Sequence, residues 1–208
     1  MPMAVILVLA SIILLASSLL ILFLINFYRD PKRNIPKGNN IVSPADGKIM
    51  RILTTKKKTV TLKKGFVGRI EAFAGDIAPE CTIISIFMSP LDVHVNRSPI
   101  DGEVISVKHT PGKYFAAFDL KKSLMNEKNE IIIKNEKIGR IKAIQIAGFL
   151  ARRIVCNAKA GDALRKGQRF GKIVLGSQAT LILPSKKVKI IAKEGQKAAA
   201  GETILAEY

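Results

Sequence analysis

The 208-residue chain has few of the residues on which several classes of protein depend. It has no Trp, and aromatic residues make up 6% of it, which disfavours proteins that stack single-stranded bases on aromatic rings. With two cysteines, Cys81 and Cys156, and two histidines, neither a disulfide framework nor a zinc site is expected. Two unpaired thiols suit a reducing compartment. Acidic residues are scarce as well: 16 Asp and Glu stand against 34 Lys and Arg, which leaves a net charge of +18 to be explained.

Charge is also absent from the start of the chain, where Arg29 is the first charged residue. Residues 4–25 form an apolar run that, as a helix, would be about 33 Å long and would cross a hydrocarbon core of about 30 Å. No Lys or Arg precedes this run, unlike the basic start of a cleaved signal peptide. We therefore predict a membrane anchor over residues 1–28 and a linker over 29–40.

The basic residues after the anchor indicate its orientation. Arg29, Lys32, Arg33 and Lys37 follow the apolar run, and by the positive-inside rule they place the rest of the chain in the cytoplasm. A basic domain tethered in this way would lie against anionic lipid headgroups. A nucleic-acid-binding protein would explain the charge but not the anchor, so no nucleic-acid partner is expected.

Residues 41–208 are predicted to form one mainly β domain. Short segments rich in Ile, Val and Thr alternate with Gly, Pro, Asn and Asp, which is typical of strands joined by turns. These segments are 47–53, 59–63, 82–88, 102–109, 130–135, 137–148, 171–176, 180–184, 188–192 and 203–207. One short helix is predicted over 120–129.

Two pairs of similar segments occur within this domain. SPADG at 43–47 is echoed by SPIDG at 98–102, and each places an Asp-Gly turn before a strand. Glycines 161 and 167 have the same spacing as glycines 195 and 201, and such turns resemble the two halves of a biotinyl/lipoyl-type β-sandwich. The predicted fold is therefore a single β-sandwich or barrel-like domain with biotinyl/lipoyl-like glycine turns, preceded by one N-terminal transmembrane helix.

Histidine and serine supply the candidates for chemistry. His94 follows an apolar strand and has Asp92 close by in sequence, whereas His109 precedes an ordinary Thr-Pro-Gly loop and is expected to have no catalytic role. Ser177 follows Gly176 between two apolar strands, where a turn or bulge is the ordinary interpretation, and it lacks the Gly-x-Ser-x-Gly frame of a hydrolase. Taken singly, both His94 and Ser177 are compatible with a structural role.

Four groups of motifs change that interpretation when they are taken in order. They are YRDP at 28–31 with SPADG at 43–47, FMSPLDVHVNR at 87–97, QIAG at 145–148 with ARRI at 151–154 and GD at 161–162, and RFGKI at 169–173 leading to LGS at 175–177. Together they resemble the pyruvoyl-dependent phosphatidylserine decarboxylases, in the short form found in archaea and some bacteria. Gln178 stands where the family commonly has Thr, and Arg97 stands where longer relatives have a second His, so no role of that His is carried over.

The resemblance implies a self-processing carboxy-lyase that converts a serine-headgroup phospholipid, phosphatidylserine or archaetidylserine, to the ethanolamine phospholipid and CO₂. It implies that Ser177 attacks the Gly176 carbonyl, that the chain splits into residues 1–176 and 177–208, and that a covalent pyruvoyl cofactor forms from Ser177. His94 would be the base and proton donor, and Asp46 would orient it; no metal is implied. The implied partners are the membrane, the anionic phospholipid, the two fragments and further copies in a homo-oligomer.

One alternative is a membrane-tethered, biotinyl/lipoyl-like adaptor without catalysis. It would share the anchor and the sandwich, but it would lack the His94 segment and would need coiled-coil heptads that the sequence does not contain. The two hypotheses differ in whether the chain splits. Because no candidate catalytic residue precedes Asp46, removal of residues 1–28 is expected to leave self-cleavage intact.

Overall fold

The computed structural model describes residues 2–64, 68–111, 127–148, 153–174 and 177–208. This part of the chain contains one long helix, α1 (Met3–Phe27), one 3₁₀ helix, η1 (Ser185–Lys187), and short strands throughout the remainder. The strands are β1 (Asn40–Val42), β2 (Gly47–Thr55), β3 (Thr59–Lys64), β4 (Gly68–Phe73), β5 (Cys81–Met88), β6 (Val95–Arg97), β7 (Gly102–Thr110), β8 (Lys128–Asn135), β9 (Gly139–Ala147), β10 (Arg153–Cys156), β11 (Ala163–Leu164), β12 (Arg169–Val174), β13 (Ser177–Pro184), β14 (Lys189–Ile190), β15 (Lys197–Ala198) and β16 (Ile204–Glu207). The prediction of a mainly β protein is confirmed.

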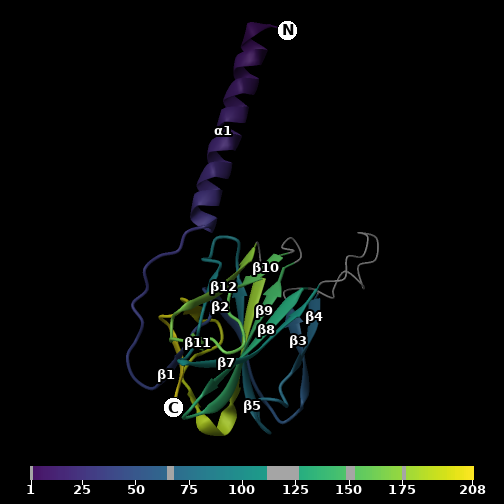
Figure 1. Ribbon diagram of the computed structural model, residues 1–208. Coiled ribbons are helices and arrows are strands. Elements are labelled where there is room, and N and C mark those ends of the chain that lie inside the picture. Colours follow the sequence, from purple (N-terminus) through teal and green to yellow (C-terminus); the bar gives the residue numbers. More distant parts are fainter. Residues whose placement is uncertain (1, 65–67, 112–126, 149–152, 175–176) are drawn as a thin grey trace.

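Helix α1 projects from the β domain as a separate rod (Figure 1). Its 25 residues carry no charge, and it is long and apolar enough to cross a membrane. The hydroxyls of Ser11 and Ser18 donate to the carbonyls of Leu7 and Leu14 one turn earlier, so they are satisfied without water. Only Phe27, at the end that meets the domain, is buried. The predicted N-terminal helix is therefore present, and its last residue belongs to the domain.

The β domain is built on one antiparallel sheet that curls around the core (Figure 1). Its strand order is β11-β7-β8-β9-β13-β5-β2-β15, while β1-β16-β14 and β10-β12-β6 form two small sheets and β3-β4 forms a hairpin. Strand β13 lies between β5 and β9 and pairs with both in continuous antiparallel register. The strand that begins at Ser177 is therefore at the centre of the fold.

Both faces of the central strands are buried, each in a different cluster. On β13, Leu181 and Leu183 face the main core inside the curl, while Ile182 between them faces a second cluster under the β3–β4 hairpin. The alternation follows from the two-residue period of a strand. Because both faces are covered, most positions of these strands are apolar, which explains the Ile- and Leu-rich runs of the sequence.

The two Ser-Pro-x-Asp-Gly segments adopt the same local structure. The Ser43 hydroxyl donates to the Ala45 carbonyl at 2.6 Å, and the Ser98 hydroxyl donates to the Ile100 carbonyl at 2.7 Å. In the same way, the backbone N–H of Gly201 donates to the Ser43 carbonyl at 2.8 Å. The backbone N–H of Gly167 donates to the Ser98 carbonyl, also at 2.8 Å. The sequence echoes are therefore equivalent structural units, each a turn closed by one glycine loop.

The predicted linker lies along the domain between these two units. The Ile35 side chain packs against both Gly167 and Gly201, whose φ angles are +77° and +79°. A Cβ on Gly167 would come within 2.2 Å of the Ile35 side chain. Asp30 binds Arg97 at 2.6 Å and also forms an ion pair with Arg169. These contacts hold residues 29–39, which connect the anchor to the domain, against the domain surface. We call this segment the strap.

Some element boundaries differ from the predictions. Most of the helix predicted over 120–129 lies outside the described residues, but its last two residues, Lys128 and Asn129, begin strand β8. The prediction was wrong there because the polar residues pair with β7 and β9, a tertiary contact that overrides local preference. The strands that were not predicted are β1, β4, β6, β10, β11 and β15. All of these except β4 have two to four residues, which carry too little periodicity to be recognised.

Candidate active site

His94 lies in the loop between β5 and β6, and the backbone on both sides fixes it in place. Its Nδ1 is 2.8 Å from the carbonyl oxygen of Asp92, and its own carbonyl accepts the N–H of Ile173 in β12 at 3.1 Å. The Asp92 carboxylate in turn accepts the N–H of Ser89 at 2.7 Å, which closes the loop. With 3% of its surface exposed, His94 is a buried residue in an ordered loop.

The contact with the Asp92 carbonyl decides which nitrogen of His94 can act as a base. A carbonyl oxygen only accepts hydrogen bonds, so Nδ1 must carry the proton and Nε2 of the neutral ring must carry the free lone pair. Nε2 is buried and has no hydrogen-bond partner among the described residues. An unpartnered buried nitrogen is costly for folding, and it is the arrangement that a proton-transfer site requires.

The surroundings of His94 keep its imidazole neutral. Burial, the largest influence, lowers the pKa of His94 below the ordinary value of 6.5, and Arg29 acts in the same direction. The Asp92 carbonyl, the Asp92 carboxylate and the more distant Asp46 carboxylate oppose this by raising the pKa. The net lowering means that His94 is available as a base at neutral pH.

One face of the imidazole is covered by Phe27, the last residue of α1. The two ring centroids are 4.2 Å apart at an interplanar angle of 36°, and Phe27 is 4% exposed. No sequence pattern indicated this contact, because an aromatic residue at the end of a membrane helix is expected at the lipid interface. The structure thus adds a residue of the anchor to the site.

Ser177 is brought to the same end of the sheet. Its backbone begins β13 opposite Met88 of β5 and Ala147 of β9, while β12, which carries the Ile173 bonded to His94, ends at Val174. Gly176 lies outside the described residues. Strand β12, which leads to the predicted cleavage site, is therefore hydrogen-bonded to His94. Strand β13, which follows the site, pairs with β5, the strand that precedes His94.

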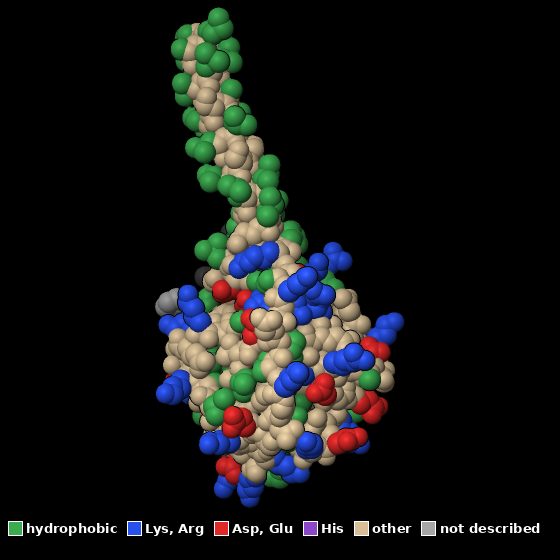
Figure 2. Space-filling model, turned by 90° about the vertical axis from the view of Figure 1, so that its left-hand side faces the viewer, with side chains coloured by type: hydrophobic (Ala, Val, Ile, Leu, Met, Phe, Trp, Pro, Cys, Tyr) green, Lys and Arg blue, Asp and Glu red, His purple; other side chains and the backbone are tan. Residues whose placement is uncertain are grey.

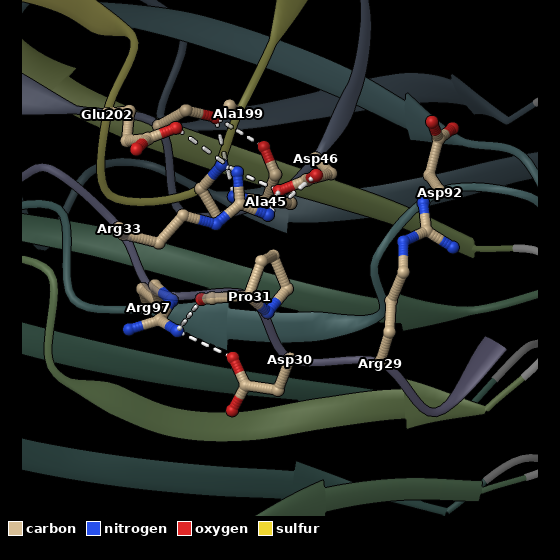
Figure 3. A network of polar contacts seen from close by, with 12 residues as sticks. Arg29, Asp30, Pro31, Arg33, Ala45, Asp46, Asp92, Arg97, Ala199 and Glu202 are labelled. Atoms are coloured by element: carbon tan, nitrogen blue, oxygen red, sulfur yellow. Dashed lines mark hydrogen bonds and ion pairs between the residues drawn. The ribbon is translucent and has the colours of Figure 1, made fainter. Parts of the chain in front are cut away.

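Asp46 lies near this site but is held by other groups (Figure 3). Its two carboxylate oxygens accept hydrogen bonds from Arg33, each at 2.9 Å, and one of them also accepts the N–H of Ala200 at 2.8 Å. Arg33 bridges to Glu202 at 3.3 Å. No hydrogen bond joins Asp46 to His94 in the described part of the chain, so the Asp92 carbonyl is the group that orients the ring. Asp46 acts on the ring through its charge.

Asp101, the counterpart of Asp46 in the second turn, is placed differently. It accepts the backbone N–H of Lys166 at 2.9 Å, as its counterpart accepts that of Ala200, but it is exposed. It is not among the groups that shift the pKa of His94. The structure therefore associates only the first of the two turns with the histidine.

Hydrogen bonds between buried amide side chains connect the motifs to one another. The Asn129 amide donates to Gln145 at 2.9 Å, Gln145 donates to Asn96 at 2.9 Å, and Asn96 donates to the Pro44 carbonyl at 3.3 Å. The chain of amides joins β8 and β9 to β6 and to the turn that carries Asp46. Sequence reasoning identified the motifs containing three of these residues but not their contact.

Three further features noted in the sequence are accounted for. Arg97, which stands where longer relatives have a second His, binds Asp30 and the Gly167 carbonyl, so it fastens the strap. His109 is 48% exposed at its side chain and lies 3.4 Å from Glu127, away from the groups that surround His94. Cys81 and Cys156 are free thiols, as predicted.

Comparison with known proteins gives a consistent result. Residues 20–206 match the family model described as phosphatidylserine decarboxylase. The chain is 44% identical over 193 residues to the "Phosphatidylserine decarboxylase proenzyme" of Chlorobium phaeobacteroides, covering 92% of this chain and 82% of that protein. It is 42% identical over 190 residues to the "Putative archaetidylserine decarboxylase proenzyme" of Methanocaldococcus jannaschii, covering 90% of each. These relatives do not favour the non-catalytic adaptor.

Proposed function

The chain belongs to the phosphatidylserine decarboxylase family and is a phospholipid decarboxylase, and we propose that it removes CO₂ from the serine headgroup of phosphatidylserine or archaetidylserine after cleaving itself between Gly176 and Ser177. The observation that carries the proposal is the buried Nε2 of His94, which has no hydrogen-bond partner among the described residues. Burial lowers the pKa of this ring, and the His94 backbone is bonded to the strand that leads to Ser177. The product would be the ethanolamine phospholipid.

The residues present fit a pyruvoyl group at position 177. The first residue of β13 is fixed between β5 and β9, and the loop that follows β5 carries the buried Nε2 of His94, which no described residue binds. A carbonyl group attached to the start of β13 would thus be held on a rigid strand, next to a group that can exchange protons. When formed, the pyruvoyl ketone supplies the electron sink that the departing carboxylate requires.

We propose that His94 first promotes self-cleavage. A serine hydroxyl is a weak nucleophile at neutral pH, so Nε2 of His94 would accept the Ser177 proton as the oxygen attacks the Gly176 carbonyl. His94 would return that proton to the Ser177 nitrogen as the C–N bond breaks, and an ester replaces the amide. Loss of the Ser177 α-proton and of the Gly176 carboxylate leaves a dehydroalanine, which water converts to the pyruvoyl group with release of ammonia.

In the decarboxylation itself, we propose that His94 handles the proton. The headgroup loses its carboxylate as CO₂, and the carbon left behind must gain one proton. Nε2 would deliver it, while Nδ1 remains bonded to the Asp92 carbonyl and the charge of Asp46 would stabilise the protonated ring. Phe27, which packs against this ring, would limit the access of water to it.

The fold explains how the two fragments would stay together. Residues 177–208 contribute β13 to the centre of the main sheet and β16 to the middle of a small sheet, between β1 and β14. Cleavage at 176–177 would leave every one of those pairings in place. We propose that the fragments remain one domain, and that its two equivalent turn units are the halves of a biotinyl/lipoyl-like sandwich. A homo-oligomer remains the expected assembly.

The surface around the end of α1 suits a membrane with anionic lipids. Lys and Arg side chains gather on the domain at the base of the helix in the face shown in Figure 2. Each basic residue near such a surface contributes about 1 kcal/mol of attraction. We propose that the domain lies against the cytoplasmic leaflet, with the basic side chains facing the headgroups.

The test of self-cleavage is the mass of the purified chain. The wild type should appear as two fragments of about 19 and about 3.5 kDa, in proportion to their shares of a 22.7-kDa chain, and the smaller should carry a ketone at a blocked N-terminus. Ser177→Ala should give one intact chain, whereas Ser106→Ala, a matched change in β7, should still split. Cleavage of the Ser177→Ala variant at the same bond would refute the proposal.

A further inference from the structure

The last turn of α1 is attached to the loop that carries His94. The side chain of Asn26 donates to the Leu91 carbonyl at 3.4 Å, and the Arg29 guanidinium donates to the same oxygen at 2.8 Å. Between these two anchors, Phe27 lies on the imidazole with ring centroids 4.2 Å apart. The helix end therefore contacts both the backbone of the loop and the ring at its end.

The ring contact supplies a constraint that the hydrogen bond does not. The bond from Nδ1 to the Asp92 carbonyl fixes one edge of the imidazole, but the ring can still tilt about that edge. A flat aromatic surface against one face of the ring restricts the tilt, and with it the direction in which Nε2 points. It also keeps water from that face, in line with the lowered pKa of His94.

We propose that Phe27 is a positioning residue of the active site, and that the end of the membrane helix completes the site instead of only tethering it. This rests on the proposed role of His94 as the proton carrier. It differs from the expectation from sequence that residues 1–28 can be removed without effect on self-cleavage. The residue acts through the ring of His94.

The first test measures the ring itself and does not depend on cleavage. In full-length Ser177→Ala protein in lipid nanodiscs, with His109→Gln to leave one histidine, the pKa of His94 is followed by NMR. The charged groups that act on this ring are Asp92, Arg29 and Asp46, and they are unchanged in all variants. Phe27→Ala should raise the pKa of His94 toward 6.5, because water reaches the ring.

Matched variants separate positioning from a loss of membrane insertion. Ile25→Ala changes the same helical turn at a residue that is 66% exposed and should leave the pKa of His94 where it was. Phe27→Leu keeps an apolar cover and should restore most of the lowered value. A pKa in Phe27→Ala equal to that of Ile25→Ala would overturn the proposal.

The second test is the rate of self-cleavage in chains that retain Ser177. Phe27→Ala should cleave about 10- to 100-fold more slowly, since small displacements of a catalytic group cost rates of this order, and Phe27→Leu should recover much of the loss. Equal rates in Phe27→Ala and Ile25→Ala would refute the proposal. A wild-type chain that never splits would instead count against the proposed function, and the pKa comparison would still decide the role of Phe27.

Discussion

Two aspartates in equivalent turns offer a matched test of the site. Asp46 and Asp101 each accept one backbone N–H from a glycine loop, at 2.8 and 2.9 Å. Only Asp46 also binds Arg33 and influences the pKa of His94. Replacing either with Asn removes one negative charge but keeps an oxygen that can accept the same N–H. We expect Asp46→Asn to slow self-cleavage and Asp101→Asn to leave it nearly unchanged.

The magnitude follows from the partners of Arg33. Its side chain is 8% exposed and makes two hydrogen bonds of 2.9 Å to Asp46, against one of 3.3 Å to Glu202. A hydrogen bond to a charged group contributes about 1.5–3 kcal/mol. If this energy no longer stabilises the geometry in which cleavage occurs, the rate of self-cleavage falls about 10- to 150-fold. Asp101 is exposed, and a surface change of about 0.5 kcal/mol alters a rate by about twofold.

The assay is the fraction of precursor cleaved over time, followed by intact mass spectrometry at a temperature where thermal melts show all variants folded. Arg33→Gln should reproduce the defect of Asp46→Asn, and the double variant should be little worse than either, since both changes remove one interaction. Equal rates for Asp46→Asn and Asp101→Asn would refute the reasoning. So would a stalled Asp101→Asn beside a normal Asp46→Asn.

Three further outcomes are expected. Self-cleavage should persist below pH 6.5 and slow only as the pH approaches the lowered pKa of His94, because the base must be unprotonated; a rate that already falls by half at or above pH 6.5 would contradict this. Gly171→Ala should prevent stable folding, since its Cβ would lie 2.3 Å from the Val155 carbonyl oxygen; an unchanged melting temperature would exclude the clash. Lys142→Met removes the 2.7 Å ion pair with Asp76. It should lower the free energy of unfolding by about 1–3 kcal/mol, or the Tm by roughly 3–10 °C, while mass spectra show unchanged self-cleavage.

The family resemblance identified the main residues of the candidate site but not all of the contacts between them. His94 and Ser177 were identified because their motifs match a family, and the structure brings their backbones to one end of the sheet. The group that orients His94 was expected to be Asp46, yet the ring is bonded to the Asp92 carbonyl. A backbone carbonyl is present at every residue, so no sequence pattern marks the one that accepts a particular hydrogen bond.

Features that depend on near neighbours along the chain were predictable from the sequence alone. The apolar run predicted α1, the Ile-, Val- and Thr-rich segments between turn residues predicted the long strands, and the repeated Ser-Pro-x-Asp-Gly predicted two turns of one kind. Hydropathy and period act over a few residues, so they can be read along the chain. Contacts between distant segments cannot. Only the tertiary structure placed Phe27 on His94 and Arg33 on Asp46, because each pair is joined by the packing of the anchor and strap on the sheet and not by local preference.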